Sequence, residues 1–259
     1  MQSLEQEKTF ALSVARDASK ILLQHYGKAT TVKTKAHAQD IVTQADLAVD
    51  TLVRKQLQKT FPEHLLYSEE SSRPSLDSPN LWIVDPLDGT RNFRSAMPIY
   101  GFLLAYAHRG ELLLGVMNFP SLGETYVAVK GRGATLNGKP IRCSQTTELT
   151  GSYGVMDAET SPERLSLMQR MVDANGEGTW SEGFGCGAYG AALVARGVRD
   201  YLQLSARGGA WDYAAPTVIL QEAGCIVTQP SGKPRPLGET AMLAANPLLH
   251  AKLVSLCRK

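Results

Sequence analysis

The stretch LWIVDPLDGTRNF, residues 81–93, decides how the rest of the chain is interpreted. Its leading apolar residues predict a buried strand, and that strand runs directly into Asp85 and Asp88. Pro86 stiffens the exit from the strand, and the bend exposes the carbonyl oxygen of Leu87. Carboxylates and a backbone carbonyl are the oxygen ligands that Mg²⁺ prefers. The end of this strand is therefore a candidate metal site.

Gly89 and Thr90 follow the aspartates and predict a turn or a helix start. Backbone N–H groups at such a position bind anions, so the segment supplies metal ligands and a phosphate cradle together. An acidic turn that caps a helix through Asp88 would carry the same letters, and the motif alone does not separate the two interpretations. The decision depends on acidic residues elsewhere in the chain.

Further acidic positions each have a simple structural interpretation. Glu69 and Glu70, in SEES, are typical of a solvated surface. Asp46, in DIVTQAD, falls in the first turn of a predicted helix, where a negative charge complements the helix dipole. Asp212, in AWDYAAP, is typical of an N-cap. Together with the aspartates that end the strand, these positions form a set that favours a multi-metal site.

Composition excludes several classes of function. The 259 residues are 43% hydrophobic and 20% charged, as in a soluble globular protein, and the formal net charge is +2. Lysine and arginine are scattered, so no nucleic-acid surface is predicted. The N-terminus lacks a signal-peptide pattern, and no apolar run approaches the roughly 20 residues of a membrane span. The cysteines lack zinc or disulfide spacing, so we expect a cytoplasmic protein with reduced thiols.

Helices open the chain. Apolar residues at helical spacing predict a first helix, with a capping box that begins at Ser3 and a stop at Gly27. A second amphipathic helix is expected to start near Thr43 and to end at Pro62. Between these helices and the centre of the chain the pattern changes from helical spacing to apolar runs separated by turns.

An antiparallel meander is predicted next. The runs IYGFLLAYA and ELLLGVMNF flank His108-Arg109-Gly110, which indicates a hairpin. The strand ETYVAVK follows, and Asn137-Gly138 is a strong signal for another tight turn. The first half of the chain is therefore expected to contain two helices, a strand and an antiparallel meander.

Three helices are predicted in the second half: 161–175, 188–197 and 213–224. Ser161 would cap the first of them. Pro216 must lie in the first turn of the last helix to be tolerated, which places that helix start just after Asp212. We expect one domain, 1–259, of class α+β. A polar stretch at 143–152 divides it weakly into an N-terminal α+β half and a C-terminal α/β half.

The motifs resemble those of the inositol monophosphatase family, within a wider lithium-sensitive phosphatase superfamily. The central block matches the family pattern D-P-[ILV]-D-G-T-x-N-F, and the later block matches W-D-x-A-A-x…E-A-G. The segment GVMNFPSLGETYVAVKGRGATLNGKPIRCS resembles the family's sheet-forming connection. The motifs stand in family order from about residue 5 to the C-terminus. This resemblance implies a layered αβαβα sandwich of the inositol monophosphatase and fructose-1,6-bisphosphatase type, and a homodimer.

The same resemblance assigns roles to individual residues. The groups that would bind two or three Mg²⁺ ions are Glu69, Asp85, the Leu87 carbonyl, Asp88 and Asp212. Asp46 would help to place the weaker ion through water and would pair with Thr90. Gly89 and Thr90 would hold the substrate phosphate by backbone N–H groups, Asp212 would also contact the substrate, and Glu70 is a further candidate.

The implied reaction is hydrolysis of a phosphate monoester by metal-activated water. Mg²⁺ neutralises the ester's charged oxygens, lowers the pKa of a water molecule and stabilises the leaving alkoxide. Glu69 and the pair formed by Thr90 and Asp46 would orient and deprotonate that water. No side chain needs to act as a nucleophile, which agrees with the lack of a Ser/His or Cys/His arrangement.

The substrate is left open by the sequence. Members that hydrolyse inositol phosphates carry an acidic residue about seven positions before the W-D aspartate, whereas this chain has Leu204 and Ser205 there. Arg91 and Arg207 could favour a second anionic group on the substrate, although Arg207 is equally an ordinary exposed loop charge. The default substrate is myo-inositol 1-phosphate. Histidinol phosphate, a sugar bisphosphate and a 3′(2′),5′-bisphosphate nucleotide remain open.

Two other classes of function have a basis in the sequence or in the resemblance. Some bacterial members that resemble this family act through protein contacts in transcription and ribosomal RNA processing, so a protein-binding regulator is the second hypothesis. Gly185-x-Gly187-x-x-Gly190 is formally a dinucleotide-binding fingerprint, but the preceding NGEGTWSE is no buried strand and the acidic residue near +20 is missing. We therefore expect a glycine-rich turn that leads into a helix beside the substrate pocket.

Overall fold

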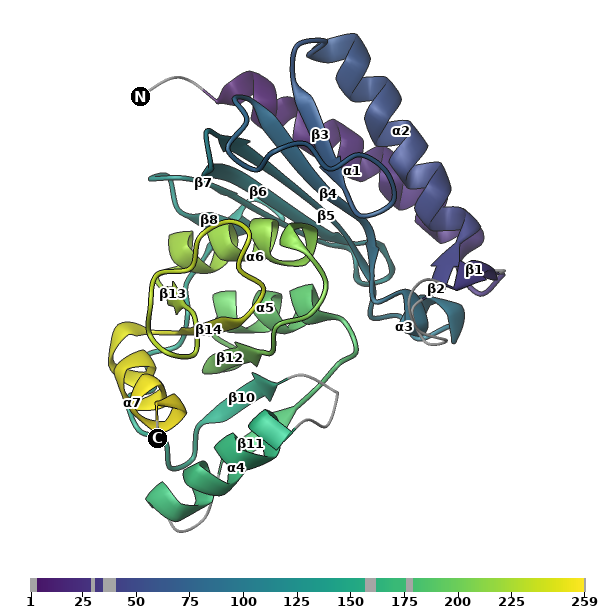
Figure 1. Ribbon diagram of the computed structural model, residues 1–259. Helices are drawn as coiled ribbons and strands as arrows, with labels where there is room; N and C mark the ends of the chain where they lie inside the picture. The colour runs from purple at the N-terminus through teal and green to yellow at the C-terminus, as the bar shows by residue number, and fades with distance from the viewer. Residues whose placement is uncertain (1–3, 29–30, 35–40, 157–161, 176–178, 259) are drawn as a thin grey trace.

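The computed structural model of the protein describes residues 4–28, 31–34, 41–156, 162–175 and 179–258. Helices and sheets alternate in layers, with helices outside both sheets and between them (Figure 1). The order of layers is α1 and α2, a seven-stranded sheet, α5 and α6, a five-stranded sheet, and finally α4 and α7. This arrangement confirms the expected α+β class and αβαβα sandwich.

The seven-stranded sheet is the larger of the two. Its strand order is β3-β4-β5-β6-β7-β8-β9. The β3–β4 pair is parallel, and all later neighbours pair antiparallel. Its strands are β3 (Leu65–Ser68), β4 (Leu81–Asp88), β5 (Gly101–His108), β6 (Glu111–Phe119), β7 (Glu124–Val129), β8 (Ala134–Leu136) and β9 (Lys139–Ile141).

Both faces of this sheet are covered, which explains the unbroken apolar runs of its central strands. Trp82 and Val84 of β4 pack against α1 (Glu5–His25) and α2 (Gln44–Thr60). Leu81 and Ile83 face the opposite layer, α5 (Gly187–Ala195) and α6 (Ala210–Glu222). The strand that carries the decisive motif is therefore held in the core from both sides.

The predicted tight turns are confirmed. Arg109 and Gly110, between β5 and β6, have φ angles of 49° and 79°. Asn137 and Gly138, between β8 and β9, have φ angles of 49° and 78°. Two consecutive residues in the left-handed region form the type of turn whose twist matches an antiparallel hairpin. These local signals set the register of the meander.

The five-stranded sheet has the order β11-β10-β12-β14-β13, with parallel pairs around β10 and antiparallel pairs around β14. Helices α4 and α7 cover its outer face. Residues 142–152 connect β9 of the large sheet to β10 of this sheet, and this is the stretch where the sequence indicated a weak division. The elements are β10 (Tyr153–Met156), α4 (Pro162–Asn175), β11 (Trp180–Glu182), β12 (Tyr201–Leu204), β13 (Ile226–Thr228), β14 (Met242–Ala245) and α7 (Pro247–Cys257).

Short elements complete the fold, and some were not predicted. A small antiparallel pair, β1 (Thr31–Thr34) and β2 (Ile41–Thr43), precedes α2, and the one-turn elements α3 (Thr90–Arg94) and η1 (Pro120–Leu122) follow β4 and β6. Helix α2 begins after its N-cap Thr43, as expected, and ends just before Pro62. The expected caps Ser3 and Ser161 lie outside the described residues.

The start of α6 differs from the prediction. The helix begins at Ala210, so Pro216 is its seventh residue and not part of the first turn. Because proline lacks an N–H, Pro216 cannot donate to the carbonyl oxygen of Asp212, at a cost of about 3 kcal/mol. The helix tolerates this because it is buried between the two sheets, where packing outweighs one main-chain bond. The expectation that Pro216 must lie in the first turn was therefore wrong.

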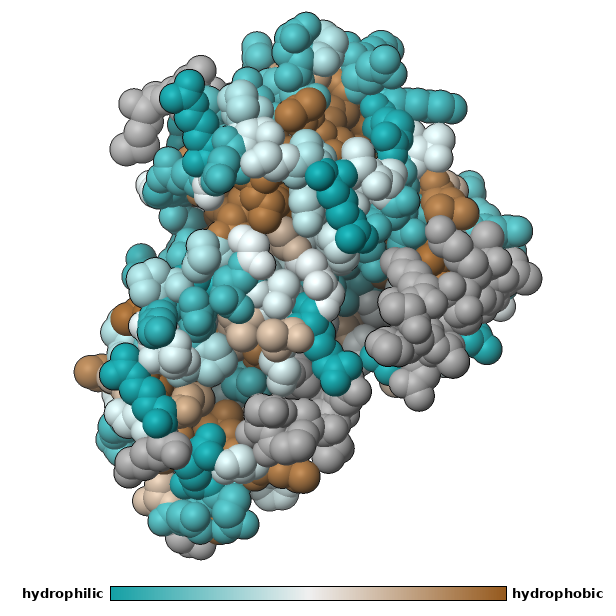
Figure 2. Space-filling model, viewed as in Figure 1, coloured by the Kyte–Doolittle hydropathy of each residue, from teal (hydrophilic) through white to brown (hydrophobic). Residues whose placement is uncertain are grey.

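The face shown in Figure 2 carries apolar side chains in small separated areas and not in one continuous patch. None of the helices in the described part of the chain has the length and hydropathy that a membrane crossing requires.

Candidate active site

The predicted carboxylates meet between the large sheet and the central helices. Asp85 and Asp88 come from the end of β4, and Asp212 comes from the first turn of α6. One carboxylate oxygen from each of the three lies within 4.8 Å of the others. Asp85 is buried, and the other two are partly buried. Asp212 lies more than a hundred positions after Asp85 and Asp88 in the sequence, and the fold brings the three together.

Local geometry at the end of β4 aims these oxygens. The pairing of β4 with β5 shifts register between Asp85 and Asp88, so the strand bulges at Pro86 and Leu87. The Leu87 backbone N–H donates to Asp85 Oδ1 at 2.9 Å, which fixes that carboxylate against its own turn. Gly89 then adopts φ 83° and starts α3, a conformation that glycine permits at little cost.

Asp88 also receives a contact that sequence analysis missed. The N-terminus of α5 points at its carboxylate, and Oδ2 accepts bonds from the Ala188 N–H at 2.8 Å and from Cys186 Sγ at 3.0 Å. The next residue, Gly89, has no room for a side chain, because its Cβ would lie 2.9 Å from the Ile99 carbonyl oxygen and 3.1 Å from Cys186 Cβ. The glycine-rich stretch 183–190 was the only sign of this contact in the sequence. It leads into the helix whose N-terminus faces Asp88, a candidate metal ligand.

Asp212 lies at the third position of α6, and not at the N-cap that its simple interpretation suggested. Its Oδ2 accepts a bond from the Gly209 N–H at 2.8 Å. A Cβ on Gly208, whose φ is +68°, would lie only 2.0 Å from the same oxygen. Gly208 is therefore required by the position of the aspartate, whereas Gly209 is required by the ring of Trp211, which would lie 2.5 Å from its Cβ.

The clustered carboxylates oppose one another's ionisation. The pKa of Asp85 is raised well above its ordinary range by burial first, and then by the charges of Glu69, Asp212 and Asp88. Burial and the charges of Glu69 and Asp88 likewise raise the pKa of Asp212. Burial raises the pKa of Asp88 too, although its bonds from the start of α5 oppose the change. A bound cation would relieve this repulsion.

Asp46 belongs to the capping box of α2 and lies close enough to Glu70 and Glu69 to be affected by their charges. Its Oδ2 accepts bonds from the Thr43 N–H at 2.9 Å and from the Thr43 hydroxyl at 2.5 Å. Burial raises the pKa of Asp46 to about 7 against these bonds, and the charges of Glu70 and Glu69 add to the rise. The family resemblance implies that Asp46 pairs with Thr90. In this structure the Thr90 hydroxyl donates instead to the Leu87 carbonyl oxygen, at 2.9 Å.

A sequence profile of the inositol monophosphatase family matches residues 3–259. The chain belongs to the inositol monophosphatase family. It is accordingly a phosphoric monoester hydrolase, as are the relatives named below that bear enzyme names.

Three relatives illustrate the range of names within the family. A fructose-1,6-bisphosphatase/inositol-1-monophosphatase of Thermotoga maritima is 33% identical over 251 residues, covering 95% of this chain and 93% of that protein. A histidinol-phosphatase of Chlorobaculum parvum is 31% identical over 249 residues, covering 95% and 94%. A Nus-factor candidate, SuhB of Neisseria meningitidis serogroup B, is 31% identical over 255 residues, covering 95% of each chain.

Solved structures agree with the fold. The Thermotoga maritima IMPase superposes with a TM-score of 0.87 at 30% identity, covering 97% of this chain and 96% of that one. An IMPase/NADP phosphatase complexed with Mg²⁺ and phosphate superposes with a TM-score of 0.87, covering 98% and 96%, and its 24% identity makes this a likeness of fold. In the present chain, the carboxylates of Asp85, Asp88 and Asp212 provide the hard oxygen donors that Mg²⁺ prefers.

The predicted substrate residues divide into two groups. Gly89 and Thr90 form the start of α3 beside the aspartates. Ser205 and Arg207, by contrast, line a cavity of about 660 Å³ on the side of the second sheet that faces α4 and α7, and the three clustered aspartates are not among its lining residues. The exposed side chain of Arg91 lies on α3. The structure thus brings three candidate metal ligands together, whereas the candidate substrate residues are divided between two places.

Proposed function

We propose that the protein hydrolyses a small-molecule phosphate monoester in a Mg²⁺-dependent reaction, with myo-inositol 1-phosphate as the default substrate. The observation that carries the proposal is the group of three buried or partly buried carboxylates, with oxygens within 4.8 Å, beside the glycine turn that starts α3. Such a group is costly to assemble without a cation, so the fold maintains it for a function.

The residues that would hold two or three Mg²⁺ ions are Asp85, Asp88, Asp212, Glu69 and the carbonyl oxygen of Leu87. When bound, Mg²⁺ supplies neutralisation of phosphoryl charge, activation of water and stabilisation of the leaving oxygen. The raised pKa values of Asp85 and Asp212 support this assignment, since burial and then the negative charges of Glu69 and Asp88 raise the pKa of both.

Residues of the chain would supply binding and proton transfer. The backbone N–H groups of Gly89 and Thr90, at the turn into α3, would bind the phosphate oxygens of the ester. Glu69 would accept a proton from the attacking water and orient it. Asp46, with a pKa of about 7, can hold or release a proton near neutral pH and would assist with Thr90. No covalent intermediate with the protein is required.

Substrate choice would depend on the groups outside this centre. Arg91 on α3 and Arg207 on the loop before α6 would favour a substrate with a second anionic group, and Ser205 stands where inositol-hydrolysing members carry an acid. The names of the relatives keep histidinol phosphate and sugar bisphosphates open as substrates. A 3′(2′),5′-bisphosphate nucleotide is a further candidate of the same chemical class.

Phosphate release measured with and without Mg²⁺ tests the proposal. The panel contains myo-inositol 1-phosphate, histidinol phosphate, fructose 1,6-bisphosphate and adenosine 3′,5′-bisphosphate. We expect one substrate to be hydrolysed much faster than the rest, and only with Mg²⁺ present. Equal rates after addition of EDTA would contradict the metal assignment, and a purified protein that releases no phosphate from any of the four would contradict the substrate class.

A second candidate function is regulation through protein contacts, which the SuhB relative favours. Its test is whether Asp85→Asn, a variant expected to be inactive, retains the cellular effect and binds a partner from the transcription machinery. We also propose a homodimer, to be measured by light scattering, and a cytoplasmic location, which the free thiols of the cysteines support.

A further inference from the structure

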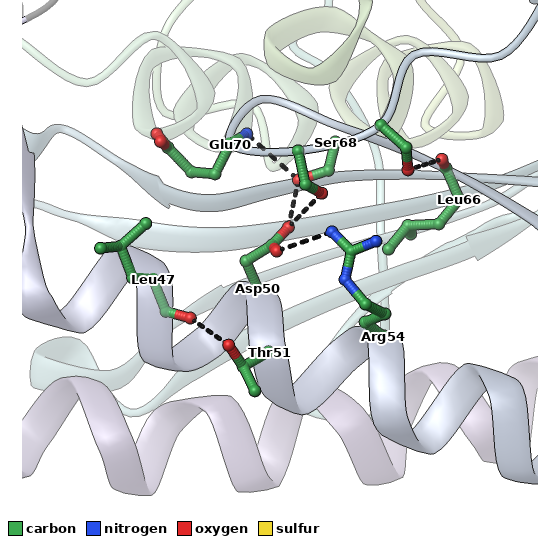
Figure 3. Close-up of polar contacts among 9 residues, drawn as sticks. Leu47, Asp50, Thr51, Arg54, Leu66, Ser68 and Glu70 are labelled. Carbon is green, nitrogen blue, oxygen red and sulfur yellow. Dashed lines mark hydrogen bonds and ion pairs between the residues drawn. The ribbon is translucent and has the colours of Figure 1, made fainter.

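The segment Ser68–Ser71 carries the two glutamates between two serines. The Ser68 hydroxyl donates to Asp50 Oδ1 at 2.5 Å, and the Ser71 hydroxyl donates to the same oxygen at 3.0 Å. Figure 3 shows Asp50 reaching from α2 to this segment, with its carboxylate between Ser68 and Arg54. One carboxylate oxygen therefore holds both ends of the Glu69–Glu70 pair.

Asp50 lies one helical turn after Asp46 and is buried. Its second oxygen, Oδ2, accepts a bond from Arg54 at 3.1 Å on the solvent side. A buried carboxylate is costly unless donors satisfy it, and here two of the three donors belong to the segment with the glutamates. The same face of α2 thus carries one acidic residue of the active site and the anchor of two others.

Hydrogen bonds extend this anchor to the backbone of the glutamates. Ser68 Oγ, while donating to Asp50, accepts a bond from the Glu70 N–H at 3.2 Å. The Glu69 N–H donates to the Val84 carbonyl oxygen of β4 at 3.3 Å, one residue before Asp85. The peptide groups on the two sides of Glu69 are therefore fixed, one from β4 and the other from α2 through Ser68.

Arg73, which stacks on Trp211 of α6, makes a second contact with the segment. Arg73 donates to the Glu69 carbonyl oxygen at 3.1 Å, and its guanidinium lies 4.5 Å from the ring centre of Trp211, the neighbour of Asp212. Because Arg73 is exposed, water can compete for its contacts with Glu69 and Trp211. The contact to Asp50 is the buried one, so it contributes most to the rigidity of the segment.

We propose that Asp50 is a positioning residue for Glu69 and Glu70, acting through the hydroxyls of Ser68 and Ser71. It would set the direction of the glutamate side chains without touching substrate or metal. The inference rests on the proposed function, in which Glu69 binds Mg²⁺ and accepts the proton of the attacking water. Groups that orient metal ligands typically contribute 10- to 100-fold to affinity or activity.

Three variants test the role of the acceptor oxygen. Asp50→Ala removes the acceptor, and we expect kcat to fall about 10- to 100-fold, with a higher Mg²⁺ concentration at half-maximal rate. Asp50→Asn retains Oδ1 as an acceptor for both serines, so we expect it to stay within a few-fold of wild type. Arg54→Met changes the other oxygen's partner and is the matched control, with activity close to wild type. Phosphate release from the fastest substrate of the panel is the readout.

A double-mutant cycle separates positioning from general stability. In a Glu69→Gln background, Asp50→Ala should cost much less than it does in wild type, because the group that it positions is already disabled. Equal costs in both backgrounds, an unaffected Asp50→Ala, or an Asp50→Asn as impaired as Asp50→Ala would each refute the role. If circular dichroism shows that Asp50→Ala is unfolded, the double variant of Ser68→Ala and Ser71→Ala replaces it.

The two proposals fail in different ways. Wild-type protein that releases no phosphate in a Mg²⁺-dependent manner, or a fully active Glu69→Gln, would refute the proposed function. Active wild type, impaired Glu69→Gln and unchanged Asp50→Ala would refute only the positioning role.

Discussion

Replacing Asp46 by asparagine is expected to stabilise the metal-free protein at alkaline pH. Burial raises the pKa of this carboxyl group from 3.8 to about 7, and the charges of Glu70 and Glu69 add to the effect. Asparagine carries no charge, and its Oδ1 can accept both bonds from Thr43, as the aspartate does. The substitution thus removes the cost of a buried charge and keeps the capping box.

The sign and size of the effect follow from the difference between the folded and unfolded pKa. Since the folded pKa is the higher one, the folded protein binds more protons between about pH 4 and pH 7. The contribution of Asp46 to stability is therefore present below about pH 4 and is lost as the pH rises to about 7. About three pK units at about 1.4 kcal/mol each give an upper limit of about 4 kcal/mol.

Urea unfolding in EDTA, followed by circular dichroism, measures this contribution. The free energy of unfolding of Asp46→Asn minus that of wild type should be near zero at pH 4 and should rise by up to about 4 kcal/mol at pH 8. Asp17 is the control carboxyl group, because bonds from Lys20 and Gln56 lower its pKa, so Asp17→Asn should change stability in the opposite direction. A difference for Asp46→Asn that does not vary with pH would refute the reasoning.

Three further outcomes are expected. Asp85→Asn or Asp88→Asn should abolish phosphate release with an unchanged circular dichroism spectrum, and full activity in either variant would contradict the site. Gly208→Ala should lower activity at least tenfold and stability by about 1–3 kcal/mol, because its Cβ would lie 2.0 Å from Asp212 Oδ2. Its control is Gly27→Ala, which has a similar φ of +72° with nothing within 4 Å, so equal losses of activity would show that backbone strain alone is responsible. Li⁺ and Ca²⁺ at millimolar concentrations should inhibit phosphate release by competing for the carboxylates, and unchanged initial rates would contradict the expected metal geometry.

Local chemistry explains what the sequence could predict. The turn at Asn137-Gly138 and the N-cap Thr43 depend on neighbours within a few residues, so both can be recognised from the sequence before the fold is known. The acidic motif around Asp85 was interpretable for the same reason, since the strand and its turn are contiguous. Resemblance to a family then supplied the fold and the set of distant carboxylates.

Contacts between distant segments explain what the sequence could not predict. The bond from Ala188 to Asp88 joins residues a hundred positions apart, and the glycine-rich stretch around Ala188 does not show which distant residue its helix faces. The early start of α6 was hidden by Pro216, because helix propensity cannot show that burial between two sheets compensates for a missing bond. The hydrogen bond between Asp50 and Ser68 could likewise not be predicted from the sequence, because Asp50 has the pattern of an ordinary polar residue on a surface helix.

The helix that caps Asp88 has a consequence for how the enzyme assembles. A cut between residues 143 and 152 would leave Asp85 and Asp88 on one fragment, and Asp212 with the capping helix on the other. Neither fragment alone could form the candidate cation site. Cation affinity would then report the reassembly of the two pieces, and in the intact chain it would report the docking of the central helices onto the large sheet.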